Sequence, residues 1–381
     1  MVTKISGGKL ILPEGIVEGK SIYYENGKIL AVTDEELPFD CEKKANGNYV
    51  SAGFIDIHVH GGFGVRFEDA TEEEIIKACD GHFERGTTAI YPTLSSSSIE
   101  AMQNAAALVR KVKEDKSTKA EIIGIHLEGP YFSPLQCGAQ DPNNIRKPQK
   151  EEYLEFLEEY SDIIRRWSYA PEVDPDLEFL HTLTDFNVMA SAAHTDALYS
   201  EMMKAYNNGM KMITHFYSCT STVTRKGGFR FPGVLEAGYL TDGITVEAIT
   251  DGCHLPPELI RLIHKVKGTE KMCLVTDSIR YGGMENEADG IEDDHCLVED
   301  GVAKLKDRSA FAGSIATTDR LVRTCVKQAG IPLVDAVKMM TQTPAEIMKL
   351  DKKGKIIYGY DAEFVIFDED INVVEVIRQS K

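Results

Sequence analysis

The 381-residue sequence predicts an α/β protein built on a (β/α)8 TIM barrel, with a small β-sandwich domain made from both chain ends. Two observations carry this prediction. β-like runs alternate with helix-periodic segments through the middle of the chain, and short runs broken by turn residues occupy both ends. We therefore expect the barrel over residues 51–354 and the sandwich from residues 1–50 and 355–381.

Eight runs are predicted to form the barrel strands. Most are followed by a polar segment with helical periodicity. After the first, Thr71 and Glu74 have the spacing of a capping box that opens a helix, and Gly86 stands where that helix should end. The eight runs are Phe54–His60, Thr87–Leu94, Glu121–Glu128, Arg166–Pro171, Asn187–His194, Lys211–Phe216, Ile244–Ile249 and Lys271–Asp277.

The two ends of the chain have a different character. Their apolar and polar residues alternate over short stretches, and Asn26-Gly27 between two of them is typical of a β-hairpin. We expect these strands to pair into one sandwich beside the barrel. They are Lys9–Leu12, Ser21–Tyr24 and Lys28–Val32 near the start, and Lys355–Tyr358, Ala362–Asp368 and Val373–Ile377 near the end.

Composition narrows the classes of partner. A formal net charge of −19 disfavours nucleic acid and anionic membrane, which attract cationic surfaces. No apolar run reaches the ~18 residues of a membrane span, and the N-terminus lacks a signal-peptide pattern, so we expect a cytoplasmic protein. The eight cysteines include no Cys-x-x-Cys pair, which argues against a disulfide framework or a cysteine zinc site.

Several predicted strands end in residues that bind metal ions. His58 and His60 share one side of the first strand because side chains alternate along a strand. Glu128, His194 and His215 end three later strands. Side chains at the carboxyl ends of parallel barrel strands can meet around one ion, which predicts a hydrolytic metal centre. Taken alone, the pair of His58 and His60 would fit a structural role equally well, and His194 or His215 by itself would fit a structural role better than a ligand role.

Asp277 is the candidate general base. It follows Leu274 and Val275, in a run too apolar for a surface acid, so we expect its carboxylate to be desolvated beside a cation.

Seven motifs are spread over nearly the whole chain. They are Gly53-Phe54-Ile55-Asp56-Ile57-His58-Val59-His60-Gly61, His126-Leu127-Glu128-Gly129-Pro130, Ala193-His194-Thr195, Thr214-His215-Phe216-Tyr217, Asp251-Gly252-Cys253-His254, Leu274-Val275-Thr276-Asp277 and Ala312-Gly313-Ser314. Together they resemble the amidohydrolase superfamily and, within it, the N-acetylglucosamine-6-phosphate deacetylase branch. The Glu-Gly-Pro motif is specific to that branch, where Glu128 would replace the carboxylated lysine of related branches.

The resemblance implies one or two divalent metal ions per subunit. Glu128, His194 and His215 would hold the principal ion, and His58 with His60 would hold a second one. Zinc is the first expectation, and iron, manganese or cobalt would also suit these ligands. The family also implies a homodimer in which the partner completes the barrel mouth.

By the same resemblance, the substrate is a small phosphorylated amino sugar. The acetamide of N-acetylglucosamine 6-phosphate would be hydrolysed to glucosamine 6-phosphate and acetate, with metal-bound water as the nucleophile. Asp277 would act as general base and then as general acid. His254 would contact the sugar and steady the carbonyl oxygen.

The remaining substrate contacts implied by the resemblance lie in loops. Arg225 matches the phosphate-binding arginine best, and Arg230 is close enough to compete. The chain departs from the family where Ser218-Cys219-Thr220 replaces Asn-Ala-Met and where Gln140 stands in place of a common histidine, which leaves the sugar open. The other expected contacts are Gly138 and Ala139 in the covering loop, Ser218 and Cys219, and Phe311, Ala312 and Gly313 in the pocket-lining loop.

Two alternatives stay open at this point. One is another amidohydrolase, acting on a different N-acetylated sugar phosphate or on a cyclic amide. The other is a catalytically silent barrel that serves as a scaffold, which the fold alone does not exclude.

Overall fold

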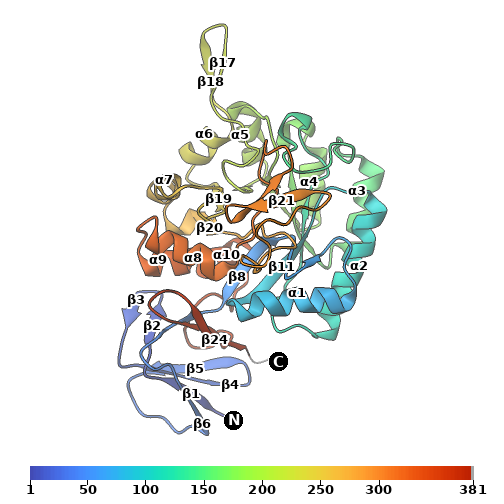
Figure 1. The fold of residues 1–381 in the computed structure, drawn as a ribbon. Helices are drawn as coiled ribbons and strands as arrows, with labels where there is room; N and C mark the ends of the chain where they lie inside the picture. The colour runs from blue at the N-terminus through green and yellow to red at the C-terminus, as the bar shows by residue number, and fades with distance from the viewer. Residues whose placement is uncertain (379–381) are drawn as a thin grey trace.

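The structure, a computed structural model, describes residues 1–378 and has two parts, a barrel and a smaller unit of two β-sheets below it in Figure 1. Both β1 (Thr3–Ser6) and β24 (Val373–Arg378) belong to the smaller unit. Within the described residues, no helix is long and apolar enough to cross a bilayer.

One parallel sheet forms the barrel. Its strands run in the order β12, β11, β13, β14, β15, β16, β19, β20, and β8 pairs with β11. β12 and β13 are two pieces of one barrel position, and each of the eight predicted runs overlaps an observed strand. The bounds are β8 Phe54–Val59, β11 Thr87–Leu94, β12 Glu121–Ile122, β13 Ile125–Glu128, β14 Ile164–Tyr169, β15 Met189–Ala192, β16 Met212–Ile213, β19 Thr245–Ala248 and β20 Met272–Leu274.

The barrel closes between its first strand and the segment that follows its last one. Val59 and Ser278 form a parallel bridge, and the Asp277 backbone N–H donates to the His58 carbonyl over 2.9 Å. Closure of the barrel therefore brings together His58, a predicted metal ligand, and Asp277, the predicted general base. The predicted fold class, a TIM barrel with a small β unit from both ends, is confirmed.

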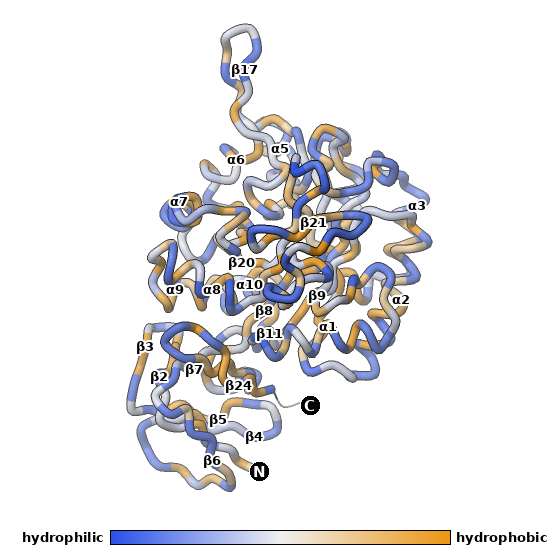
Figure 2. Tube along the Cα trace, viewed as in Figure 1, coloured by the Kyte–Doolittle hydropathy of each residue, from blue (hydrophilic) through white to orange (hydrophobic). Residues whose placement is uncertain are grey.

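Helices cover the outside of the barrel (Figure 1). The predicted capping box is present, with the Thr71 hydroxyl accepting from the Glu74 N–H and the Glu74 carboxylate accepting from the Thr71 N–H. Orange and blue segments alternate along α1 and α2 in Figure 2, as expected for helices with one face on the sheet. The helices are α1 Glu72–Glu84, α2 Ile99–Asp115, α3 Lys150–Tyr160, α4 Glu178–Asp185, α5 Tyr199–Asn207, α6 Val234–Leu240, α7 Pro257–Lys267, α8 Thr318–Lys327, α9 Leu333–Met340 and α10 Gln342–Ile347.

The smaller unit packs one sheet of order β5-β4-β1-β6 and one of order β24-β23-β7-β2-β3 around a separate apolar core. The strand predicted at Lys355–Tyr358 is wrong, because this stretch has no strand pairing and runs from irregular backbone into a turn, with Ile356 buried in that core. Residues 379–381, the end of the predicted sandwich region, lie outside the described residues. The other strands are β2 Lys9–Leu12, β3 Gly15–Val17, β4 Ser21–Glu25, β5 Lys28–Thr33, β6 Cys41–Lys44, β7 Tyr49–Ala52 and β23 Glu363–Phe367.

Candidate metal centre and substrate pocket

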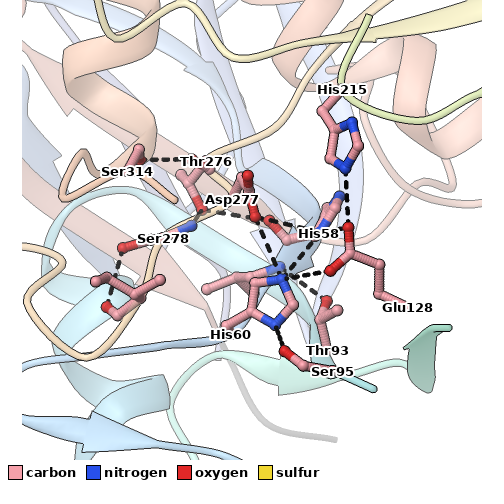
Figure 3. A network of polar contacts seen from close by, with 12 residues as sticks. His58, His60, Thr93, Ser95, Glu128, His215, Thr276, Asp277, Ser278 and Ser314 are labelled. Carbon is pink, nitrogen blue, oxygen red and sulfur yellow. Dashed lines mark hydrogen bonds and ion pairs between the residues drawn. The ribbon is translucent and has the colours of Figure 1, made fainter. Parts of the chain in front are cut away.

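Four histidines and two carboxylates meet at the carboxyl ends of the barrel strands and form two adjacent clusters. Figure 3 shows five of them, His58, His60, Glu128, His215 and Asp277. All six residues are buried, and within each cluster the ligand atoms lie within 4.8 Å of one another. The first cluster consists of His58, His60 and Asp277, and the second cluster consists of Glu128, His194 and His215.

The first cluster is built across the barrel closure. Strand alternation in β8 brings His58 and His60 to one side, and Asp277 follows β20. Asp277 Oδ1 lies 3.3 Å from His58 Nε2 and 3.2 Å from His60 Nε2. The two Nε2 atoms are 3.2 Å apart, so three donor atoms surround one point.

The second cluster draws one residue from each of three strand ends. Glu128 ends β13, whereas His194 and His215 follow β15 and β16. Glu128 Oε1 lies 3.2 Å from His194 Nε2 and 2.9 Å from His215 Nε2. Its other oxygen, Oε2, lies 3.2 Å from His60 Nε2, so the carboxylate of Glu128 stands between the two clusters.

The donor atoms fit two divalent cations. In the second cluster the Nε2 atoms of His194 and His215 face each other at 3.1 Å, and the first cluster repeats this arrangement at 3.2 Å. Two neutral imidazole nitrogens that point lone pairs at each other repel unless a proton or a cation lies between them. Imidazole and carboxylate groups are ligands for several transition metals. The clusters are therefore consistent with a binuclear site.

The histidines keep both carboxylates charged. Burial alone would raise the pKa of Glu128, but hydrogen bonds from the surrounding histidines, His194 first among them, hold that pKa well below its usual range. Burial likewise opposes ionisation of Asp277, and the neighbouring charge of His58 together with a hydrogen bond from His60 lowers its pKa. Both groups are thus available as anionic ligands or proton acceptors.

Three of the six residues have left-handed backbone conformations. The φ angles are 44° at His194, 27° at His215 and 48° at Asp277. Such angles are uncommon for residues with a side chain and cost about 1–3 kcal/mol each. The surrounding barrel holds them in place, and the strain turns these side chains toward the common centre.

Sequence reasoning missed the groups that anchor the outer ring nitrogens. Three histidines use Nδ1 for an anchor and thereby leave Nε2 facing the clusters. The anchors are Ser95 Oγ at 2.9 Å from His60, the Gln136 carbonyl at 2.8 Å from His194, and Glu247 Oε2 at 3.1 Å from His58. Of these, Glu247 carried a signal, because it is a charged residue inside a run predicted to be a buried strand.

A cavity of about 620 Å³ opens over the clusters. Gly138 lies beside it, where φ is +56° and an added Cβ would come within 2.5 Å of Cys219 Sγ, so this position requires glycine. The predicted contact residues that line the cavity are Ala139, Ser218, Cys219, His254, Phe311, Ala312 and Gly313.

His254 is held on the cavity wall by two neighbours. Its Nδ1 lies 2.9 Å from Asp251 Oδ2, and its ring lies 4.8 Å from the ring of Phe311. Burial alone would lower the pKa of His254, but the charge of Asp251 and the hydrogen bond to it raise that pKa. Because Nδ1 donates to Asp251, Nε2 is the atom available to other groups.

Comparison with known proteins shows which family has this architecture. The model of the amidohydrolase family matches residues 49–381. The chain belongs to the amidohydrolase family. The N-acetylglucosamine-6-phosphate deacetylase of Bacillus subtilis is 30% identical over 97% of this chain and 93% of that protein. The N-acetylgalactosamine-6-phosphate deacetylase of Shewanella is 32% identical over 85% of this chain and 80% of that protein.

A solved structure is similar over the full fold. The N-acetyl-D-glucosamine-6-phosphate deacetylase mutant of Mycobacterium smegmatis, in complex with N-acetyl-D-glucosamine-6-phosphate, has a TM-score of 0.88 and 28% identity. The match covers 99% of this amidohydrolase and 97% of that chain. The family expected from the seven motifs is therefore confirmed.

Arg225 and Arg230 lie apart from the cavity of this amidohydrolase, and neither is among the described residues that line it. They are paired directly across a hairpin of β17 (Thr224–Lys226) and β18 (Phe229–Phe231), which projects from the barrel at the top of Figure 1. Phe229 on this hairpin is 74% exposed.

Two arginines that sequence reasoning missed do line the cavity. Arg66 in β10 (Val65–Arg66) and Arg280 each have a buried Nε without a hydrogen-bond partner among the described residues. Arg66 Nε lies 3.6 Å from Glu68 Oε2 and Arg66 Nη2 lies 3.4 Å from Asp69, whereas Arg280 lies 3.9 Å from Asp293. Among the described residues, these are the arginines that line the cavity.

Gln140, the residue in place of the family histidine, contacts the metal cluster directly. Its amide nitrogen donates to Glu128 Oε2 over 2.7 Å, and its carbonyl oxygen accepts from the Ser96 N–H over 3.0 Å. The departure from the family pattern therefore falls on a residue that contacts Glu128 as well as lining the cavity.

Proposed function

We propose that this amidohydrolase removes the acetyl group of N-acetylglucosamine 6-phosphate and releases acetate and glucosamine 6-phosphate. The observation that carries the proposal is the pair of buried ligand clusters at the floor of a cavity large enough for a sugar phosphate. The names of the relatives from Bacillus subtilis and Mycobacterium smegmatis support this substrate.

Glu128, His194 and His215 would hold one divalent cation, and His58 with His60 would hold a second one. When bound, such a cation lowers the pKa of water toward ~7 and polarises a carbonyl group. The oxygen of Glu128 that faces His60 would let one carboxylate serve both ions. Zinc is the first candidate for both positions.

Asp277 would take a proton from the attacking water and return it to the nitrogen of the departing amine. The lowered pKa of its carboxyl keeps it unprotonated and able to accept that proton, and its place at the cavity wall puts it within reach of the amine. Proton transfer of this kind is typically worth ~10²–10⁴-fold in rate. His254, held by Asp251, would offer Nε2 to the carbonyl oxygen of the acetamide.

The hairpin arginines would bind phosphate in the cavity of a second copy, which makes the protein a homodimer. Arg225 and Arg230 stand opposite each other, and like charges in such a pair destabilise a hairpin unless an anion lies between them. The exposed Phe229 next to them would be covered by the partner.

N-acetylgalactosamine 6-phosphate is the second candidate substrate. It is favoured by the similarity to the Shewanella deacetylase and by Ser218 and Cys219, which line the cavity where the family pattern differs. The two sugars differ at one hydroxyl group, so the same metal chemistry would serve either of them.

The test is acetate release from both N-acetylhexosamine 6-phosphates and from the two unphosphorylated sugars, after reconstitution with zinc, iron, manganese or cobalt. We expect the glucosamine derivative with phosphate to give the highest kcat/KM. R225A/R230A should raise KM for phosphorylated sugars only. Equal losses with and without phosphate would contradict the phosphate assignment.

The same panel separates the remaining alternatives. A scaffold would release no acetate from any sugar and would contain no more than trace metal. Turnover of cyclic amides in preference to sugars would point to a different amidohydrolase reaction.

A further inference from the structure

A buried ion pair inside the barrel touches both halves of the metal centre. Glu247 in β19 and Arg166 in β14 are each 0% exposed, and the guanidinium of Arg166 donates to Glu247 Oε1. Replacing a buried ion pair by apolar residues of similar size is often neutral or stabilising. Fold stability therefore gives little reason for charges at this position.

The carboxylate of Glu247 contacts one residue of each cluster. Its Oε2 lies 3.1 Å from His58 Nδ1 and accepts from the His215 backbone N–H over 3.0 Å. Because a carboxylate can only accept, His58 must carry its proton on Nδ1. The unprotonated Nε2 of His58 then faces the first cluster.

Arg166 reaches the chain neighbours of the same two histidines. Its guanidinium donates to the Thr214 hydroxyl over 2.7 Å and to the Ile57 carbonyl over 3.4 Å. It also donates through Nε to Ser191 Oγ over 2.9 Å. The ion pair thus ties together the ends of the strands that carry the cluster histidines.

We propose that Glu247, with its charge balanced by Arg166, is a positioning residue for the metal centre and acts above all on His58. It fixes the tautomer and ring orientation of His58 and makes Nε2 a stronger donor to a cation. The contact to the second cluster is made through the backbone of His215, so the side-chain effect falls mainly on the first cluster. This inference rests on the proposed metal centre.

The test uses R166M/E247L, which removes both charges together and leaves no unpaired buried ion. We expect this variant to stay folded while zinc at the first cluster binds about 10–100-fold more weakly, as is typical when an outer partner of a ligand is lost. Zinc at the second cluster should change less than about threefold. Chelator competition gives the two dissociation constants, elemental analysis gives the stoichiometry, and H60A identifies the constant of the first cluster.

A control removes another buried pair of charges, far from the ligand clusters. Lys353 and Glu363 lie 2.6 Å apart, each 8–9% exposed. Two of their other partners, Glu121 and Arg378, lie 3.2 Å from each other, so these two charges stay paired in the variant. K353M/E363L should leave both zinc constants within about twofold of wild type. If R166M/E247L does not fold, the zinc constants of E247Q, which keeps the arginine, provide the same readout. E247D, which keeps the carboxylate, should bind zinc at the first cluster more tightly than E247Q.

Unchanged zinc constants in a folded R166M/E247L variant would overturn the inference, as would equal weakening at both clusters. Wild-type protein that binds no zinc would contradict the proposed function instead. The two failures are therefore distinguishable from the same titration.

Discussion

The two metal-ligand clusters lie side by side but are assembled in different ways. In the first cluster, His58 and His60 come from one strand, and their outer nitrogens are anchored by the side chains of Glu247 and Ser95. In the second cluster every residue comes from a different strand end, and the outer nitrogen of His194 is anchored by a backbone carbonyl.

This difference indicates how each cluster can change. Side-chain anchors can be replaced by mutation, so single substitutions can weaken or abolish metal binding at the first cluster. The second cluster depends on the barrel backbone, including the left-handed angles at His194 and His215, and is less sensitive to single changes around it. We therefore expect the second cluster to hold its cation after the first cluster has lost one.

The largest effect should follow E128A, because Glu128 contacts both clusters. We expect both cations to be lost and kcat/KM to fall by at least about 10³-fold, since neither water activation nor carbonyl polarisation remains. Elemental analysis and acetate release measure the two results. Retention of both ions would show that the clusters are independent of their shared carboxylate.

D277N should separate proton transfer from metal binding at the second cluster. The amide cannot take the proton of water, so kcat should fall ~10²–10⁴-fold while KM changes little. The second cluster does not include Asp277, so its ion should remain bound at wild-type affinity. A variant with near-normal kcat would assign proton transfer to another group.

H60N should break the first cluster alone. The variant should keep one ion of two and lose the stabilisation supplied by the other, which is about 2.7 kcal/mol when free zinc stands at 100 times its dissociation constant. Thermal unfolding with and without zinc measures this difference. The matched variant H194N should lose more activity than H60N, and the reverse order would contradict the comparison.

Much of the fold could be predicted from residue patterns. The eight barrel runs were recognisable because fully buried parallel strands are continuous apolar segments, and the candidate ligands stood at their ends. The strand predicted at Lys355–Tyr358 was wrong because Ile356 is buried from an irregular segment, and an apolar residue next to polar ones looks the same in a strand or in such a segment.

The groups around the ligands could not be predicted in the same way. The anchor of His194 is the carbonyl of Gln136, and a backbone contact leaves no trace in residue type. The pairing of Arg166 with Glu247 joins strands 81 residues apart in sequence. Arg225 lies on a hairpin that projects away from the barrel. The direction in which a hairpin leaves the barrel cannot be read from the types of its residues.

The smallest effect should follow S95A, which removes the hydroxyl anchor of His60. Ser95 Oγ lies 2.9 Å from His60 Nδ1, but Glu68 Oε1 lies 3.6 Å from the same nitrogen and can partly replace it. We therefore expect zinc at the first cluster to bind about 10-fold more weakly, the lower end of the range for outer anchors, with the second cluster unaffected. S97A in the same loop is the matched control. An S95A constant equal to that of S97A would assign the anchoring of His60 to Glu68 alone.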